Sequence, residues 1–192
     1  MLLMPQKCVF LDRDGVINKI VYRAGKPTSP RTIEEFEFEE GVEPALKRLS
    51  AVGFLLFVVT NQPELARGLV TAESMAMMTA ALVTNLPEIK EVRICPHDND
   101  DSCSCRKPHP GMLVELAHKY DLSLKDSYIV GDTWKDSCAG SGAGCKSIIL
   151  DRSYNHSDPA DWRVPNLRSA VDVICVSQGR DLGSRPYRLT VL

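Results

Sequence analysis

The sequence has no long apolar run: its longest, Phe54 to Val59, is far shorter than the roughly 20 residues that a membrane helix needs. The segment from Met1 to Phe10 lacks the charged, apolar and small-residue order of a signal peptide. Net basic charge is missing too, since 23 Lys and Arg stand against 25 Asp and Glu. We therefore expect a cytoplasmic protein that binds neither membranes nor nucleic acid.

An even set of cysteines, as a disulfide framework would need, is also absent. The chain has 7 cysteines, and three of them crowd with one histidine into a polar loop over 95–105. Three thiolates and an imidazole match a closed tetrahedral zinc site, and such a cross-link would order a loop with few apolar groups. The alternative is a set of reduced surface cysteines beside an incidental histidine. The expected ligands of this structural Zn²⁺ are Cys95, His97, Cys103 and Cys105.

The remaining composition is that of an ordinary globular protein. At 192 residues, with 44% hydrophobic and 25% charged residues, the chain is expected to form one domain over 1–192. We expect a monomer whose tail, Gly179 to Leu192, is peripheral.

Short apolar runs alternate with helical patterns along the chain. Their order predicts an α/β fold with a doubly wound, mostly parallel sheet and helices on both faces. The connections are too short for a separate cap domain, and 154–165 has the composition of a polar loop. The predicted strands are 7–11, 54–59, 92–94, 128–130 and 147–150, and the predicted helices are 42–49, 71–86, 113–120, 136–143 and 167–175.

Polar residues follow three of these strands. In a doubly wound sheet, ligands bind beyond the carboxyl ends of the strands, so these segments should meet. Carboxylate and carbonyl oxygens there suit Mg²⁺, with ligands from the Asp12 carboxylate, the Asp14 carbonyl and Asp132. Asp136, one turn after Asp132, would hold a metal-bound water. The three segments are 12–15, 60–62 and 131–133.

The same residues suggest phosphoryl transfer. Asp12 could attack phosphorus to give an aspartyl-phosphate, while Asp14 protonates the leaving oxygen and then activates water. Thr60 and Asn61 could cradle the phosphate oxygens, and Lys107 would offset the negative charge of the transition state. An isolated Asp-x-Asp-Gly is weak evidence because these are common turn residues. The combination of three such segments at successive strand ends favours a catalytic site.

Four segments resemble the motifs of the haloacid dehalogenase (HAD) superfamily: 10–18 (FLDRDGVIN), 58–62 (VVTNQ), 95–112 with its CPH and CSCRKPHPGM runs, and 130–136 (VGDTWKD). The likeness covers about 7–150 and implies a Rossmann-like HAD fold. It implies Asp12 as nucleophile, Asp14 as acid and base, and both with Asp132 on Mg²⁺. It also places the loop 19–23 at the site. The substrate-binding residues expected on this basis are Arg13, Thr60, Asn61, Gln62, Arg106, Lys107 and Thr133.

The zinc loop narrows the resemblance to a branch that includes heptose bisphosphate and histidinol-phosphate phosphatases. Segments 35–38 and 66–68 favour the heptose bisphosphate enzymes, so we expect a small phosphorylated sugar as substrate. Two departures, Pro63-Glu64-Leu65 and Thr133, fall where the distal part of the substrate would lie. The alternatives are a histidinol-phosphate phosphatase, an inactive fold with a protein-binding zinc loop, and a nucleic-acid 3′-phosphatase. The last is disfavoured by the net charge of −2.

Overall fold

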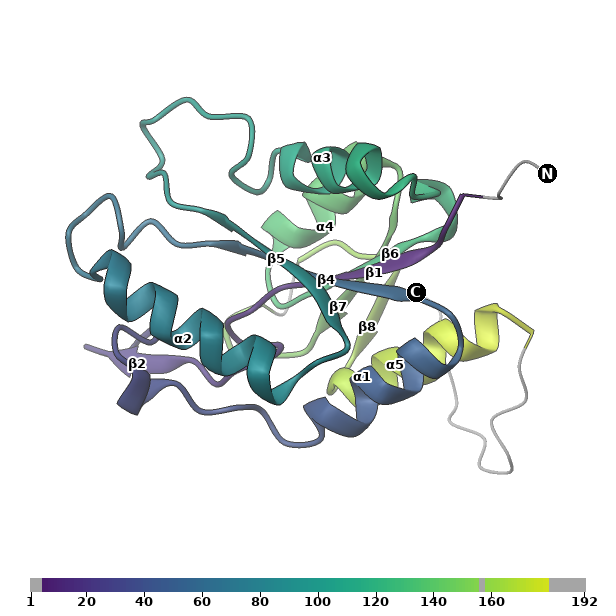
Figure 1. The fold of residues 1–192 in the computed structure, drawn as a ribbon, viewed down its shortest axis with the longest axis horizontal. Coiled ribbons are helices and arrows are strands. Elements are labelled where there is room, and N and C mark those ends of the chain that lie inside the picture. Colours follow the sequence, from purple (N-terminus) through teal and green to yellow (C-terminus); the bar gives the residue numbers. More distant parts are fainter. Residues whose placement is uncertain (1–4, 156–157, 180–192) are drawn as a thin grey trace.

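A six-stranded parallel sheet forms the centre of the fold (Figure 1). The computed structural model describes residues 5–155 and 158–179. The strand order is β5-β4-β1-β6-β7-β8, so the chain winds outward in both directions from β1, and the predicted doubly wound sheet is confirmed. The strands are β1 (Cys8–Leu11), β4 (Leu55–Asn61), β5 (Ile89–Cys95), β6 (Tyr128–Gly131), β7 (Lys146–Leu150) and β8 (Trp162–Val164).

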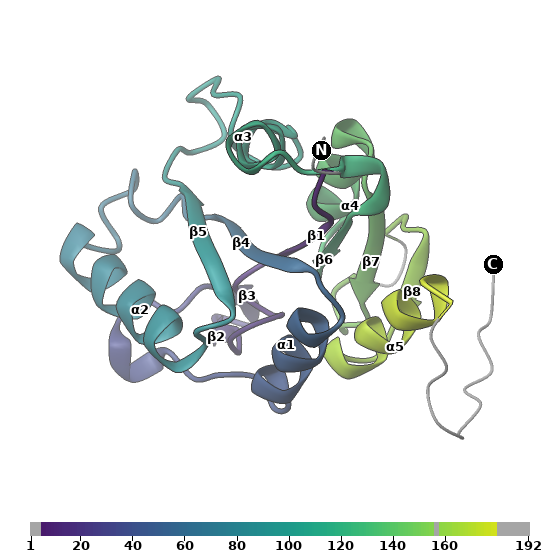
Figure 2. The same cartoon turned by 45° about the vertical axis from the view of Figure 1, so that its right-hand side comes forward.

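Helices cover both faces of this sheet (Figure 2). Alternate residues of each strand face opposite sides, so Cys8 and Phe10 pack with α3 while Val9 and Leu11 pack toward α1 and α5. Burial on both faces explains why the strands are continuous apolar runs. The helices are α1 (Val42–Ala51), α2 (Ala72–Asn85), α3 (Gly111–Tyr120), α4 (Trp134–Ala143) and α5 (Leu167–Ser177), with 3₁₀ turns at Ile33–Glu35 and Leu124–Asp126.

Side-chain caps fix where several helices begin. Thr71 Oγ1 accepts a hydrogen bond of 3.0 Å from the Ser74 amide at the start of α2, and Asn166 Oδ1 accepts one of 3.0 Å from the Ser169 amide at the start of α5. Helix α4 begins at Trp134, two residues earlier than its apolar pattern indicates. The reason is a capping box in which Thr133 and Asp136 bind each other's backbone amides.

Two short elements were not predicted. Strands β2 (Val21–Arg23) and β3 (Lys26–Thr28) pair as an antiparallel hairpin between β1 and α1. Strand β8 lies inside 154–165, so the expectation of a plain polar loop there was wrong. Three-residue strands are too short to show an alternating pattern in the sequence. Among the described residues, this hairpin is the only strand pair between β1 and α1. The described residues contain no cap domain, as expected. Of the expected peripheral tail, 180–192 lies outside the described residues.

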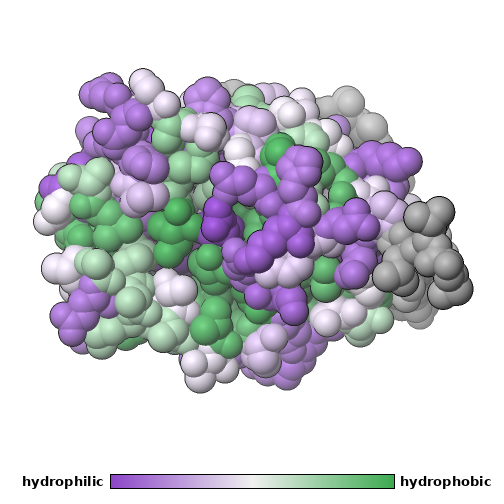
Figure 3. Space-filling model, turned by 45° about the horizontal axis from the view of Figure 1, so that its top comes forward, coloured by the Kyte–Doolittle hydropathy of each residue, from purple (hydrophilic) through white to green (hydrophobic). Residues whose placement is uncertain are grey.

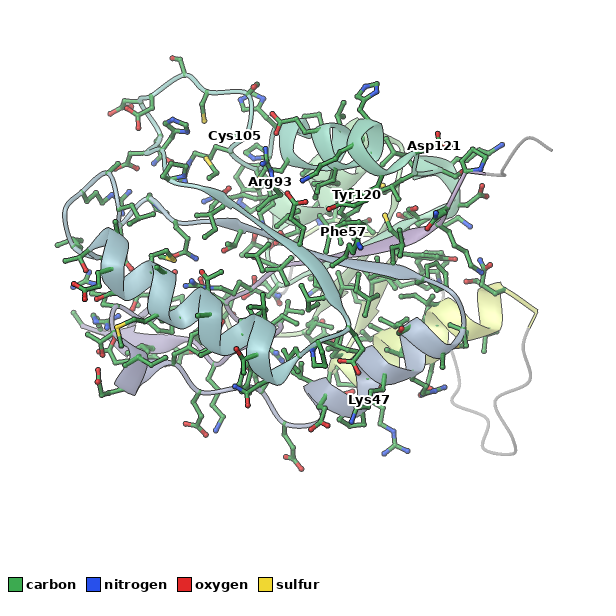
Figure 4. The ribbon with its side chains drawn as sticks, in the orientation of Figure 1. Lys47, Phe57, Arg93, Cys105, Tyr120 and Asp121 are labelled. Carbon is green, nitrogen blue, oxygen red and sulfur yellow. The ribbon has the colours of Figure 1, made fainter. Side chains whose placement is uncertain are left out.

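Strand β5 forms one edge of the sheet and is covered by charged side chains. Arg93 pairs with Glu115 of α3, and Lys119 Nζ lies 2.7 Å from Glu91 (Figure 4). Charges on an edge strand discourage pairing with another chain. Figure 3 views the molecule with the top of Figure 1 turned toward the reader, and hydrophilic residues lie across the middle of this face. Within the described ranges, no helix is long and apolar enough to cross a bilayer.

Candidate active site

The carboxyl ends of β1, β4 and β6 meet around a cavity of about 310 Å³, here called the strand-end cavity. Its position follows from the register, because Leu11 pairs with Val58 on one side and Val130 on the other. The next residues of the three strands therefore converge. Eight of the expected site residues line this cavity: Asp12, Asp14, Thr60, Asn61, Arg106, Lys107, Asp132 and Thr133.

Lys107 is the buried cation at the floor of the cavity. Its side chain is only 2% exposed, and its Nζ lies 2.9 Å from Asp12 Oδ1 and 2.6 Å from Asp136 Oδ1, and donates to the Val59 carbonyl at 2.8 Å. The two carboxylates keep the lysine charged by raising its pKa against the effect of burial. Three partners on three elements thus fix one positive charge beside Asp12.

Asn61 places the backbone of Lys107. Its amide group donates to the Lys107 carbonyl at 2.8 Å and accepts from the Lys107 amide at 3.0 Å. This pair of hydrogen bonds joins the end of β4 to the segment that follows the polar loop over 95–105, here called the Cys/His loop. Asn61 thereby has a positioning role in addition to its place in the cavity wall.

Negative charge is in excess around Asp12. Carboxylate oxygens of Asp12, Asp132 and Asp136 lie within 4.8 Å of one another. Burial, with Asp136 and Asp14 nearby, raises the pKa of Asp12 to about 7 although Lys107 opposes this, and burial with the Asp12 charge raises that of Asp132. Hard oxygen donors that repel one another in a buried site fit a divalent cation such as Mg²⁺.

Asp14 has a different environment from its neighbour. Its side chain binds the Arg13 guanidinium and accepts from Asn18 at 2.9 Å and from Gln62 at 2.8 Å. Although burial acts to raise the pKa of Asp14, Arg13 and these hydrogen bonds lower it overall. The pKa values of these two carboxylates, two residues apart, are therefore shifted in opposite directions.

Arg13 and Gln62, both expected at the substrate, do not line the strand-end cavity. Arg13 is 1% exposed and its guanidinium contacts Asp14 and Met75, while Gln62 is 0% exposed and also donates to Thr60 Oγ1 at 2.8 Å. Membership of a motif does not show which way a side chain points, because residues of one extended motif can point to opposite sides of the chain. Both side chains bind the Asp14 carboxylate without lining the cavity.

Asp136 is already engaged by protein groups. One carboxylate oxygen pairs with Lys107, and the other accepts from the Thr133 amide at 3.1 Å and from its hydroxyl at 2.8 Å. Gly131 makes this packing possible, because a Cβ there would lie 2.2 Å from the Asp136 side chain. Asp136 does not line the cavity. Its contacts fit a residue that orients Lys107 better than one that holds a metal-bound water.

The Cys/His loop contains a donor set of four side chains that could hold a metal ion: Cys95, His97, Cys103 and Cys105. The separations among the sulfur atoms of Cys95, Cys103 and Cys105 run from 3.2 to 3.7 Å, and His97 Nδ1 lies 3.3 Å from Cys105 Sγ. Zn–S bonds of about 2.3 Å place sulfurs about 3.8 Å apart in a tetrahedron, so these four side chains fit Zn²⁺. Figure 4 shows Cys105 in the loop that leads from β5 to α3.

This loop also holds Arg106. The guanidinium donates to the carbonyl of His97 at 3.0 Å and to Asn99 Oδ1 at 2.9 Å. A residue of the donor set is therefore bonded directly to a cation of the cavity wall. An ordered loop is needed to keep Arg106 in place.

Several cavity residues were missed in the sequence. Tyr154 and Lys135 line it, and the hairpin region contributes Ile20, Thr28 and Ser29, of which only Ile20 lies in the expected loop 19–23. Lys135 is half-buried, and burial together with Arg106 lowers its pKa. The single lysine of the TWKD segment, 133–136, was a usable signal for Lys135. Nothing in the local sequence pattern marks Tyr154, because it lies in a loop outside the four motifs.

Known proteins match both this fold and these motifs. Residues 104–167 match the HAD-hydrolase-like family model. The D-glycero-beta-D-manno-heptose-1,7-bisphosphate 7-phosphatase of Helicobacter pylori J99 is 31% identical over 182 residues, which cover 90% of this chain and 99% of that protein. The Escherichia coli K12 protein of the same name is 34% identical over 83% of this chain and 88% of its own length.

The chain belongs to the heptose bisphosphate phosphatase family of HAD-like hydrolases. A solved member of this family, the D,D-heptose 1,7-bisphosphate phosphatase of B. bronchiseptica in complex with magnesium and phosphate, superposes with a TM-score of 0.78 at 27% identity, covering 89% of this chain and 99% of that one. A Campylobacter jejuni relative, named for the alpha rather than the beta anomer, is 35% identical over 77% of this chain and 83% of its own length. The resemblance drawn from the four motifs is thus confirmed.

The charge excess around Asp12 generates a prediction about pH and Mg²⁺. An aspartate whose folded-state pKa is raised to about 7 binds more protons when folded, so it destabilises the Mg²⁺-free protein as pH rises from about 4 through 7. Mg²⁺ should therefore raise the Tm more at about pH 7.5 than at about pH 5. Thermal unfolding of zinc-replete protein with and without Mg²⁺ measures this. Equal shifts at both pH values, or the same shifts in Asp12→Asn, would contradict it.

The link between the Cys/His loop and Arg106 generates a second prediction. Cys103→Ser should lower the zinc content from about one per chain, lower the Tm and raise KM, because Arg106 is no longer held. Elemental analysis, thermal unfolding and steady-state kinetics measure the three effects. Cys138→Ser is the matched control, since Cys138 is exposed and outside the donor set. Wild-type protein that is active with reduced cysteines and no zinc would rule the site out.

Proposed function

We propose that this HAD-type phosphatase removes the 7-phosphate of heptose 1,7-bisphosphate through an aspartyl-phosphate on Asp12. The observation that carries this is the position of Asp12 at the floor of the strand-end cavity. Its Oδ1 accepts from the Arg13 amide at 2.7 Å and lies 2.9 Å from Lys107 Nζ, which leaves Oδ2 available among the described contacts. A carboxylate held by one oxygen presents the other as a nucleophile.

Asp14 is the group that moves protons in this scheme. As Asp12 bonds to phosphorus, the bond to the sugar oxygen breaks and Asp14 gives that oxygen a proton. The lowered pKa of Asp14 keeps it ionised in the free protein. An incoming phosphate dianion raises it, because a nearby like charge favours the neutral form. In the second step, ionised Asp14 takes a proton from the water that attacks phosphorus and releases Asp12.

Lys107 and Thr60 hold the phosphoryl group during both steps. The lysine is placed by Asp136 and Val59 before substrate arrives, so its charge needs no reorganisation when negative charge develops on the phosphoryl oxygens. Asp12, the Asp14 carbonyl and Asp132 would hold Mg²⁺, which supplies further neutralisation of the phosphate when bound. Zn²⁺ in the Cys/His loop would be structural.

Two cations at the cavity wall suit the second phosphate of the substrate. Arg106 and Lys135 both line the cavity, and neither makes an ion pair with a carboxylate among the described residues. Lys135 is half-buried beside Arg106 and Lys107, and an anionic group bound there would offset the repulsion among these cations. A cationic amine, as in histidinol phosphate, would be repelled at the same place. Pro63 and Glu64 also line the cavity, and Arg31 donates to the Glu64 carboxylate at 2.9 Å.

The nucleophile assignment predicts a severe loss in Asp12→Asn. Turnover should fall by at least about three orders of magnitude, or about 4 kcal/mol of barrier, and Asp14→Asn should also be strongly impaired. Phosphate release measures turnover, and circular dichroism and zinc content check the fold. The control is Asp121→Asn, because Asp121 ends α3 with a positive φ of 51° that asparagine also adopts. A tenth of wild-type activity in Asp12→Asn would exclude the nucleophile role.

The cations at the wall predict a preference for a bisphosphate. Heptose 1,7-bisphosphate should exceed a heptose monophosphate and histidinol phosphate by about ten- to a hundredfold in kcat/KM, since a charge-assisted contact is worth about 1.5–3 kcal/mol. Arg106→Ala and Lys135→Ala should each shrink the margin, whereas Lys125→Ala, at an exposed site, should not. A clear preference for histidinol phosphate would overturn the heptose proposal and leave the phosphatase chemistry standing.

A further inference from the structure

A dipeptide after β7, Tyr154-Asn155, contacts Asp132 at two points. The Tyr154 hydroxyl donates to Asp132 Oδ2, and the Asn155 amide group donates to the Asp132 carbonyl at 2.7 Å. One residue thus binds the carboxylate and its neighbour binds the backbone of the same aspartate. Both residues lie in the segment that the sequence presents as a polar loop.

The dipeptide is itself fixed to the sheet. Asn155 is 2% exposed, and its amide group also donates to the Leu150 carbonyl at 2.7 Å. Its Oδ1 accepts from the Arg152 amide at 2.9 Å and from the Arg163 guanidinium at 3.0 Å. These bonds tie the turn to β7 and β8. Tyr154 therefore approaches Asp132 from a rigid base rather than from a free loop.

The contact between Tyr154 and Asp132 is closely packed against Gly15. A Cβ at Gly15 would lie 2.2 Å from Asp132 Oδ2 and 3.1 Å from the Tyr154 hydroxyl. The Gly15 backbone also has a φ of +80°, which glycine adopts without strain. The glycine of the first motif thus leaves the space in which the tyrosine and the aspartate meet.

From this geometry we propose that Tyr154 is a positioning residue for the divalent-cation site, holding Asp132 by Oδ2 so that Oδ1 is presented to Mg²⁺. The proposal rests on the Mg²⁺ site of the proposed function. A hydrogen bond to a ligating carboxylate fixes its orientation, and loss of such a partner typically lowers metal affinity about 10- to 100-fold. Tyr154 also lines the cavity, so direct contact with the sugar is the competing role.

The test is the affinity for Mg²⁺ in the absence of substrate. Isothermal titration of zinc-replete Tyr154→Phe with MgCl₂ should give a Kd about 10- to 100-fold above wild type, with the Tm of the Mg²⁺-free protein unchanged within about a degree. Tyr120→Phe is the matched control, since the Tyr120 hydroxyl donates to Glu91 at 2.7 Å outside the cavity. Its Kd should equal that of wild type.

Two results would overturn the proposal. A Kd for Mg²⁺ within twofold of wild type in Tyr154→Phe refutes it, and a raised KM for the sugar with that unchanged Kd would assign Tyr154 to the substrate instead. Asp132→Asn separates this failure from that of the proposed function. If wild type binds Mg²⁺ and Asp132→Asn does not, the metal site stands whatever Tyr154→Phe shows; if wild type binds no Mg²⁺, the metal site itself fails.

Discussion

The burial of the Lys107 ammonium group is the constraint on which the rest of the site depends. An ammonium group that is 2% exposed is costly unless its charge is compensated, and Asp12 and Asp136 provide that compensation at 2.9 and 2.6 Å. Asp136 needs the absence of a side chain at Gly131, and it also caps α4 through Thr133. Helix α4, strand β6 and the Asp12 carboxylate are therefore arranged around one cation.

Around Asp12, negative charge still exceeds positive charge after this compensation, because three carboxylates lie beside one ammonium group. Lys107 neutralises part of the Asp12 and Asp136 pair, and Arg13 is committed to Asp14 behind the cavity. Among the described residues, the Asp132 carboxylate accepts a hydrogen bond only from the neutral hydroxyl of Tyr154. Its pKa is raised, chiefly by burial and then by the Asp12 charge. A divalent cation would offset this imbalance, and in the proposed function the phosphoryl group would then bring its negative charge to a compensated site.

Most of the fold, and the site residues at the ends of the central strands, can be predicted from the local sequence. The runs that become β1, β4 and β6 are buried on both faces, so their polar ends identify Asp12, Thr60 and Asp132 without further information. Side-chain direction is not local in this way. Gln62 and Arg13 share the motifs of the cavity residues, and only the packing around Asp14 shows that they lie behind it. Tyr154 reaches Asp132 across 22 residues, through a loop anchored by a three-residue strand.

The Cys/His loop shows how a segment outside the core can control the chemistry. The loop has few apolar groups, so a metal ion bound by its four ligands would order it. Only one residue lies between Cys105 and Lys107, and that residue, Arg106, is bonded to the His97 carbonyl. On the other side, Asn61 binds the Lys107 backbone with both atoms of its amide group. Lys107 is therefore held between this loop and the end of β4. In the proposed function, a loosened loop would move both Lys107, which would face the transferred phosphate, and Arg106, which would face the second phosphate. The proposed reaction would thus depend on a structural cross-link that touches none of the reacting atoms.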